Sequence, residues 1–176
     1  MYSLDGLLAD QGTEYWDFCF GLPDDPASWQ EKLDLYETAY AHIMGRTAYQ
    51  AMASALPAAA HPFTPVMNAA RKVVLSRTLT AAGWANTTIA SGDTAEEVDT
   101  LRLGGDGHIV VWGGVRLWRS LMRLDLIDEF RLDLHPYVAG QGTRLFEDVP
   151  PSYRLDLESA TRFSNGILGL RYTRNR

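Results

Sequence analysis

The stretch HIVVWGGVRLWRSLM, residues 108–122, decides the fold of this chain. An apolar, β-branched run ends at Gly113-Gly114, and a helical pattern begins directly after the two glycines. A helix N-terminus carries free backbone N–H groups and a partial positive charge, so a glycine pair there lets a phosphate approach the backbone. The same junction can also be a tight turn that binds nothing, and the pair alone does not decide between these interpretations.

Two further segments repeat the junction between a strand and a helix. HIMGRTAYQAM leads to Gly45-Arg46 and then a helical pattern, and VVLSRTL ends its strand at Ser76-Arg77-Thr78. If the three strands are parallel neighbours, their ends share one sheet edge, where open α/β sheets bind ligands. Backbone amides, hydroxyls and two guanidinium groups there suit a ligand with several phosphates. Taken singly, each Arg is better explained as a solvated residue at a helix start.

Short β-branched runs predict four strands, at residues 42–44, 72–76, 87–90 and 108–112. They are continuously apolar, which is typical of parallel strands buried on both faces, and helical stretches separate several of them. The end of the chain instead alternates in part and contains Asn165-Gly166, a signal for a two-residue hairpin loop. We therefore predict an α/β fold of three layers, with a mostly parallel central sheet, flanking helices and a C-terminal antiparallel hairpin.

Local signals place helix ends and loops. Ser28 with Glu31, and Thr94 with Glu97, have the spacing of capping boxes and predict two helix starts. The prolines of residues 56–70 favour a surface loop. Residues 1–6, MYSLDG, look like the end of a strand most of which is absent.

Composition limits the classes of function. The chain has 176 residues, a net charge of −6 and no Lys/Arg stripe, which predicts one domain over residues 1–176 that binds neither nucleic acid nor an anionic membrane. One cysteine allows no internal disulfide, and the scattered histidines make a metal site improbable. With neither a signal peptide nor an apolar span in the sequence, we expect a cytoplasmic protein.

Six segments occur in an order that resembles a known family. They are SLDGLLA, MGRTAYQAM, RKVVLSRTL, HIVVWGGVRLWRSLM, DEFRLDLHPYVAGQGTRLF and the terminal hairpin. Together they resemble the dihydrofolate reductase fold family, and more closely the reductase domain of the bifunctional riboflavin-biosynthesis deaminase–reductase and its stand-alone bacterial relatives. The resemblance covers nearly the whole chain.

The resemblance implies a central sheet of about eight strands, NADPH as cofactor and a homodimer. It implies that cofactor contacts come from Gly45, Arg46 and Thr47; from Ser76, Arg77 and Thr78; and from Gly113, Gly114, Val115, Arg116 and Leu117. The glycine pair would hold the pyrophosphate, and Arg in place of an acidic residue at these loops favours NADP over NAD. Asp5, in SLDG, would lie on the substrate side and contact the substrate or assist as an acid.

Two departures from the family pattern stand out. The usual G-R-x-T-Y-E reads Gly45 to Gln50 here as GRTAYQ, with Ala48 in place of the usual Thr. No zinc-binding deaminase segment is present in the sequence.

The sequence therefore predicts an NADPH-dependent reductase that transfers a hydride to a small polar substrate. The first candidate substrate is 5-amino-6-(5-phosphoribosylamino)uracil of riboflavin synthesis, and dihydrofolate is the second. Two other classes stay open at this point: a non-catalytic NADP-binding member of the family, and a simple α/β interaction domain that binds no dinucleotide.

Overall fold

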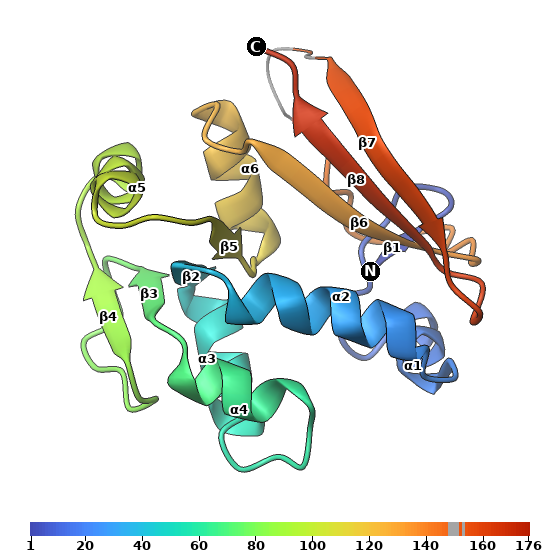
Figure 1. The fold of residues 1–176 in the computed structure, drawn as a ribbon, viewed down its shortest axis with the longest axis horizontal. Helices are drawn as coiled ribbons and strands as arrows, with labels where there is room; N and C mark the ends of the chain where they lie inside the picture. The colour runs from blue at the N-terminus through green and yellow to red at the C-terminus, as the bar shows by residue number, and fades with distance from the viewer. Residues whose placement is uncertain (148–151, 153) are drawn as a thin grey trace. The chain divides into compact units, whose positions relative to one another are not determined.

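The computed structural model describes residues 1–147, 152 and 154–176 (Figure 1). The chain divides into two compact units. Unit 1 comprises residues 1–30 and 127–176, and unit 2 comprises residues 31–126. The assignment of all 176 residues to a single domain stays a prediction.

Unit 2 is built on a four-stranded parallel sheet in the order β4-β3-β2-β5. Its strands are β2 (Ala41–Gly45), β3 (Lys72–Leu75), β4 (Thr87–Ala90) and β5 (Ile109–Val111). The sequence predicted all four to within two residues at either end. Because β2 pairs with β3 on one side and β5 on the other, the chain segments that follow these strands leave the sheet at one edge.

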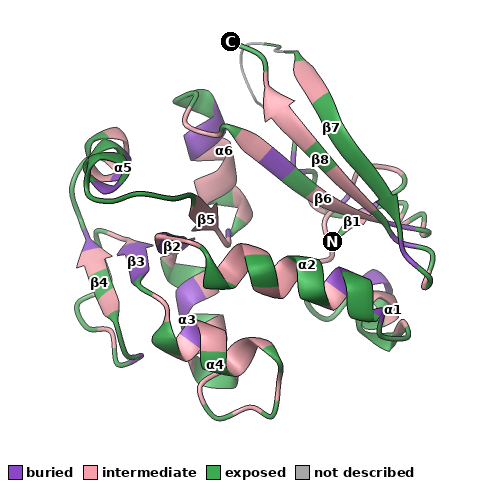
Figure 2. Ribbon diagram, viewed as in Figure 1, coloured by how far each residue is buried: buried purple, intermediate pink, exposed green. Residues whose placement is uncertain are grey.

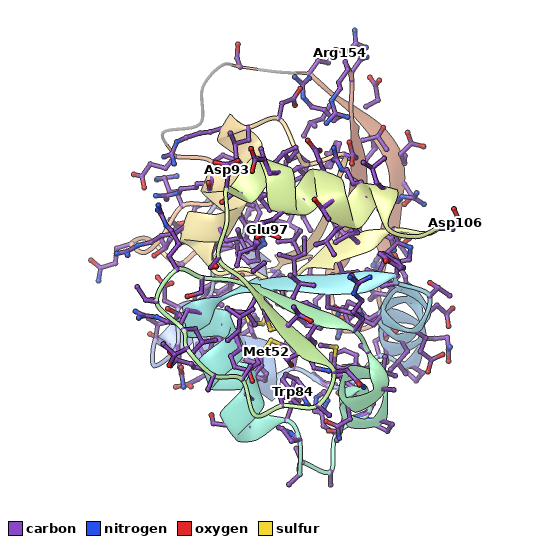
Figure 3. All side chains as sticks on the ribbon, turned by 90° about the vertical axis from the view of Figure 1, so that its left-hand side faces the viewer. Met52, Trp84, Asp93, Glu97, Asp106 and Arg154 are labelled. Carbon is purple, nitrogen blue, oxygen red and sulfur yellow. The ribbon has the colours of Figure 1, made fainter. Side chains whose placement is uncertain are left out.

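Helices cover both faces of this sheet (Figures 1 and 3). On one side lie α3 (Arg46–Ala55) and α4 (Phe63–Ala69), and on the other lie α5 (Thr94–Leu103) and α6 (Val115–Arg123). A further helix, α2 (Pro26–Glu37), crosses the boundary between the units. The predicted α/β class, with a parallel sheet between helices, is confirmed.

The centre of unit 2 is buried along whole strands rather than on alternate residues (Figure 2). Residues 41–44 of β2 are all at most 1% exposed, which explains the continuous apolar run in the sequence. One core cluster on the α3 and α4 side gathers buried side chains from β2, α3, α4, β3 and the loop before β4. It consists of Met44, Tyr49, Met67, Val74 and Trp84.

Lys72 is fully buried beside this core, and two carbonyl oxygens and an aromatic ring stabilise its ammonium group. Nζ donates to the carbonyls of Met67 at 2.6 Å and Ala70 at 2.7 Å, and lies 4.7 Å from the ring centre of Trp84. These carbonyls belong to the C-terminal turn of α4 and the residue after it, where a cation is favoured. Burial lowers the pKa of Lys72 to about 8.

Unit 1 contains a four-stranded mixed sheet in the order β1-β6-β8-β7. Its elements are β1 (Tyr2–Ser3), α1 (Glu14–Gly21), β6 (Glu129–His135), β7 (Leu155–Arg162) and β8 (Leu168–Arg174). β1 is parallel to β6, while β6, β8 and β7 are antiparallel neighbours. The C-terminal hairpin is confirmed, and the strands of the described residues form two sheets of four rather than one central sheet.

The hairpin loop is longer than its Asn-Gly signal predicted. Phe163 N donates to Ile167 O at 2.9 Å, and Phe163 O accepts from Gly166 N at 3.1 Å. Three residues, 164–166, therefore lie between the hydrogen-bonded residues Phe163 and Ile167, and Gly166 takes the left-handed conformation with φ of 86°. A type I turn followed by a left-handed glycine is the common three-residue solution.

Both capping boxes were predicted wrongly. Asp25 Oδ1 accepts from Ser28 N at 2.9 Å, so α2 begins before Ser28. Asp93 caps α5 by accepting from the amides of Ala95 and Glu96. An aspartate is at least as good an N-cap as Ser or Thr, and its charge also favours the positive end of the helix. The Ser and Thr therefore lie inside the helices.

The prediction of a surface loop at residues 56–70 is right only for its first half. Its second half forms α4, with Pro65 in the first turn. Proline is tolerated there because the first N–H groups of a helix have no partner within the helix. The prolines therefore indicated a helix start as well as a loop.

Candidate functional site

The carboxyl edge of the parallel sheet brings the three predicted junctions together. Gly45 ends β2 at the centre, and its register partner on β3 is Leu75, directly before Ser76. On the other side, Gly45 N donates to Gly113 O at 2.8 Å. The three segments thus lie side by side at one edge of the sheet, as the sequence predicted.

The glycine pair has one enclosed and one open member. Gly113 is buried with φ of 103°, and a Cβ there would lie 2.7 Å from Cζ2 of Trp118. Gly114 is exposed, and a Cβ there would meet no atom within 4 Å. The peptide bond between them is cis. Only glycine fits the first position, whereas the second leaves open space over the backbone.

Two helices start at this edge without a side-chain cap. α3 begins after Gly45 and α6 after Gly114, and neither glycine position carries a side-chain hydrogen bond to the helix N-terminus. The first-turn residues Thr47, Val115, Arg116 and Leu117 follow these starts. The free N–H groups of both helices therefore form two adjacent positive ends, suited to an anion.

Arg46 connects the first two junctions through its side chain. Its Nη1 donates to Thr78 Oγ1 at 3.0 Å, across 32 residues of sequence. Ser76 Oγ accepts from the amides of Thr78 at 3.2 Å and Leu79 at 3.0 Å, which fixes the loop after β3. Arg46 and Arg77 are exposed, so this edge presents two cationic groups to solvent.

Asp5, the predicted catalytic residue, lies in unit 1 and accepts three hydrogen bonds. Oδ1 accepts from Ser3 Oγ at 2.7 Å and Ala139 N at 3.0 Å, and Oδ2 accepts from Gly140 N at 2.7 Å. These bonds, that from Ser3 foremost, lower the pKa of Asp5 to about 2. The carboxyl group is therefore ionised at neutral pH, which favours a role as an acceptor over a role as a proton donor.

An aromatic group around Tyr15 was not predicted from the sequence. Tyr15 is buried, stacks on Tyr137 with 5.1 Å between ring centres, and meets His135 edge-on at 6.1 Å. Burial is the main cause that raises the pKa of the Tyr15 hydroxyl. Because Tyr15 and its ring partners are about 120 residues apart in the sequence, no local pattern could have paired them.

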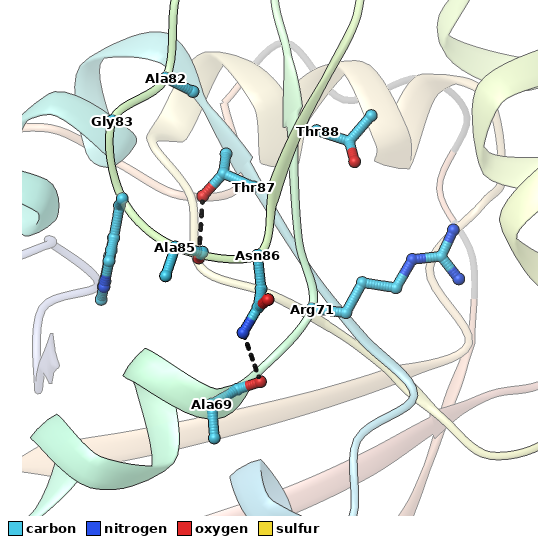
Figure 4. Close-up of a pocket in the computed structure, with 9 residues that line it drawn as sticks. Ala69, Arg71, Ala82, Gly83, Ala85, Asn86, Thr87 and Thr88 are labelled. Carbon is cyan, nitrogen blue, oxygen red and sulfur yellow. Dashed lines mark hydrogen bonds between the residues drawn. The ribbon is translucent and has the colours of Figure 1, made fainter.

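Two surface hollows lie in unit 2, and none of the predicted cofactor residues lines them. The first has a volume of about 720 Å³ and is lined by residues that include Arg71, Trp84 and Asn86 (Figure 4). The second, of about 780 Å³, is lined by α3 and the loop from Leu79 to Ala85. The first hollow lies at the start of β4, where its lining includes Thr87, at the opposite end of that strand from its carboxyl end. We therefore base the site on the sheet edge and not on either hollow.

In residues 1–147, 152 and 154–176, no group of three or more His, Cys, Asp or Glu side chains is arranged to hold a metal ion. Within the same part of the chain, no helix has the length and apolarity needed to cross a bilayer.

Comparison with known proteins identifies the family. Residues 1–169 match the RibD C-terminal domain, so the chain belongs to the RibD C-terminal domain family. It is 30% identical to the uncharacterized protein YyaP of Bacillus subtilis, over 97% of this chain and 89% of that protein.

Solved structures share the fold. A putative riboflavin biosynthesis protein from Shewanella superposes with a TM-score of 0.81 at 23% identity, covering 99% of this chain and 96% of that one. The deaminase/5-amino-6-(5-phosphoribosylamino)uracil reductase of Thermotoga maritima superposes with a TM-score of 0.66 at 16% identity, covering 99% of this chain and 54% of that one. These structures show the fold, and the match of residues 1–169 to the RibD C-terminal domain confirms the family that the sequence resembles.

Proposed function

We propose that this chain is an NADPH-dependent reductase whose cofactor binds along the carboxyl edge of the parallel sheet. The observation that carries the proposal is the pair of uncapped helix starts at Gly45 and Gly114, joined through the bond from Gly45 N to Gly113 O. The open space over Gly114 lets a pyrophosphate approach the free N–H groups of α6. NADPH supplies the hydride, while the chain binds and orients it.

We further propose that Arg46 and Arg77 select NADPH over NADH. Both are exposed at the edge, next to the hydroxyls of Ser76 and Thr78. A guanidinium group and a hydroxyl can both donate to a 2′-phosphate, which NADH lacks. Thr47, Val115, Arg116 and Leu117 complete the proposed contacts through the first turns of α3 and α6.

For the substrate we propose a small polar molecule, with 5-amino-6-(5-phosphoribosylamino)uracil as the first candidate and dihydrofolate as the second. Family membership and the likeness to reductases support a substrate of this kind. Asp5 is proposed to accept a hydrogen bond from it, since its ionised oxygens can accept more bonds than the three they have.

We also propose that the chain forms a homodimer in the cytoplasm. In unit 1, β7 is an edge strand paired on one side with β8, and Leu157 on it is 56% exposed. An exposed edge strand with apolar side chains is a surface on which a second chain can pair. Light scattering after gel filtration gives the mass in solution.

The test is a titration with NADPH and, separately, NADH. We expect tight NADPH binding, weaker NADH binding, and a loss of roughly tenfold or more in NADPH affinity on Arg46→Ala or Arg77→Ala, while NADH affinity changes little. Arg123→Ala, at the other end of α6, is the matched control and should leave both affinities unchanged. No binding of either dinucleotide would reject the reductase assignment. Binding without turnover of either substrate would favour the non-catalytic alternative.

A further inference from the structure

A buried histidine next to the glycine pair has no part in the site described so far. His42 lies on β2 with no exposed surface, three residues before Gly45. The indole Nε1 of Trp112 donates to its Nδ1 at 2.7 Å, and its Nε2 lies 3.1 Å from the carbonyl oxygen of Tyr36. An indole N–H can only donate and a carbonyl can only accept, so Nδ1 accepts and Nε2 carries the proton. Both bonds therefore require a neutral imidazole.

Trp112 joins this histidine to the glycine pair. Its backbone N donates to Ile43 O at 2.9 Å, and the next residue along the chain is Gly113, which accepts from Gly45. Its indole ring packs on Tyr36 with 4.4 Å between ring centres and on His42 with 6.0 Å. Trp118 closes the other side of Gly113. Gly113, which leads into α6, thus lies between Trp112, the residue before it, and the indole of Trp118 in the helix.

We propose that His42 is a positioning residue for the Gly113–Gly114 cofactor segment and acts through its hydrogen bond to the Trp112 indole. The inference rests on the proposed cofactor site and adds to it a buried residue that does not touch the ligand. Loss of the acceptor at Nδ1 frees the indole and loosens the residue that carries Gly113. Dinucleotide affinity falls as a result, whereas contacts made by the substrate are unaffected.

Burial keeps His42 neutral, and the charged and titratable groups around it contribute less. Lys72 is its register partner on β3, His108 precedes β5, and Tyr36 on α2 supplies the carbonyl. Burial is the largest cause, and with the charges of Lys72 and His108 it lowers the pKa of His42 to about 4. The acceptor at Nδ1 is therefore intact at neutral pH and is lost in acid, when both ring nitrogens become donors.

The test is a double-mutant cycle on NADPH affinity at neutral pH, read from the fluorescence of NADPH itself. We expect His42→Leu and Trp112→Phe each to weaken binding roughly three- to tenfold, as the loss of one buried hydrogen bond implies. The double variant should be no weaker than either single variant. His42→Asn, which returns an acceptor oxygen near Nδ1, should recover part of the affinity, and the KM of the substrate should not move.

Lys72→Met is the matched control, because Lys72 is equally buried on the neighbouring strand but bonds to α4. It should lower stability and leave NADPH affinity unchanged. In addition, the ¹⁵N shifts of the His42 ring should show a protonated Nε2 and an unprotonated Nδ1. Wild-type affinity in folded His42→Leu, or additive effects in the double variant, would overturn the inference alone. A wild-type protein that binds no NADPH would overturn the cofactor site and the inference together.

Discussion

Four helices of this protein start either at an aspartate or at a glycine. The aspartates cap their helices, whereas the glycines leave the helix starts open to a ligand. α2 and α5 begin at aspartates, and the carboxylates of Asp25 and Asp93 accept from their first amides. α3 and α6 begin at Gly45 and Gly114 with no side-chain cap. An aspartate both satisfies the free N–H groups and occupies the place of an anion, whereas a glycine leaves them available. The starts of α3 and α6 adjoin each other at the carboxyl edge of the sheet, whereas α4, which also lacks a side-chain cap, starts after Pro62.

The largest effect on NADPH affinity should come from converting a helix start at a glycine into one at an aspartate. Gly114→Asp places a carboxylate where the pyrophosphate is proposed to bind, in space that holds no other atom within 4 Å. We expect NADPH affinity to fall by at least about 100-fold, because like charges placed in contact cost several kcal/mol. The unfolding midpoint should stay the same or rise slightly, since an N-cap is gained.

Gly114→Asn, which has the same shape without the charge, is the control for this substitution. Its loss of affinity, measured in the same titration, should be much smaller than that of Gly114→Asp. Equal losses in the two variants would mean that steric exclusion, and not charge, decides binding at this helix start.

Acid should affect the two units in different pH ranges. The pKa of His42 in unit 2 is lowered to about 4 from 6.5, so the unfolded chain binds more protons and stability falls as pH drops from about 6.5 to 4. A shift of this size corresponds to about 3 kcal/mol. The pKa of Asp25 in unit 1 is lowered to about 2 from 3.8, chiefly by its bond from Ser164. Its contribution to stability is therefore lost only as the pH falls from 3.8 to about 2.

Urea titrations at pH 7, 5 and 4 check these ranges. The slope of stability against pH between 6.5 and 4 should flatten in His42→Asn and stay unchanged in Asp25→Asn. An unchanged slope in the histidine variant would contradict a neutral His42 in the folded state.

The smallest effect should come from removing an aspartate cap. Asp93→Ala leaves the first amides of α5 without their acceptor, which should cost about 1 kcal/mol of stability. NADPH affinity should not change, because α5 starts at a capped position. Chemical denaturation and the NADPH titration, performed on the same sample, measure both quantities. A loss of NADPH affinity in Asp93→Ala would contradict the distinction between the two kinds of helix start.

The strands and the glycine junctions could be predicted because their signals are local. A buried parallel strand is a continuous apolar run, as residues 73–75 of β3 show, whereas β4, partly buried at the end of its sheet, was located by its β-branched residues. One helix cap was predicted wrongly because Thr94 and Glu97 have the spacing of a capping box. In the structure the first amides of α5 donate to the carboxylate of Asp93 instead. Sequence spacing does not rank two acceptors that are adjacent in the chain.

The contacts that complete the site could not be predicted because they join distant segments. Arg46 and Thr78 are 32 residues apart, and Trp112 and His42 are 70 residues apart. Asp5 could be located by its motif, but its environment could not. Its low pKa depends on Ala139 and Gly140, which the fold brings to it from 134 and 135 residues away.

Amide NMR shifts during an NADPH titration show whether a dinucleotide binds at the helix starts after Gly45 and Gly114. We expect the largest shifts at the amides of Gly45, Arg46, Gly114, Val115 and Arg116, and no shift at the amides of Ala95 and Glu96 at the capped start of α5. Largest shifts at the hollow around Trp84 and Asn86, or none anywhere at saturating NADPH, would contradict this expectation.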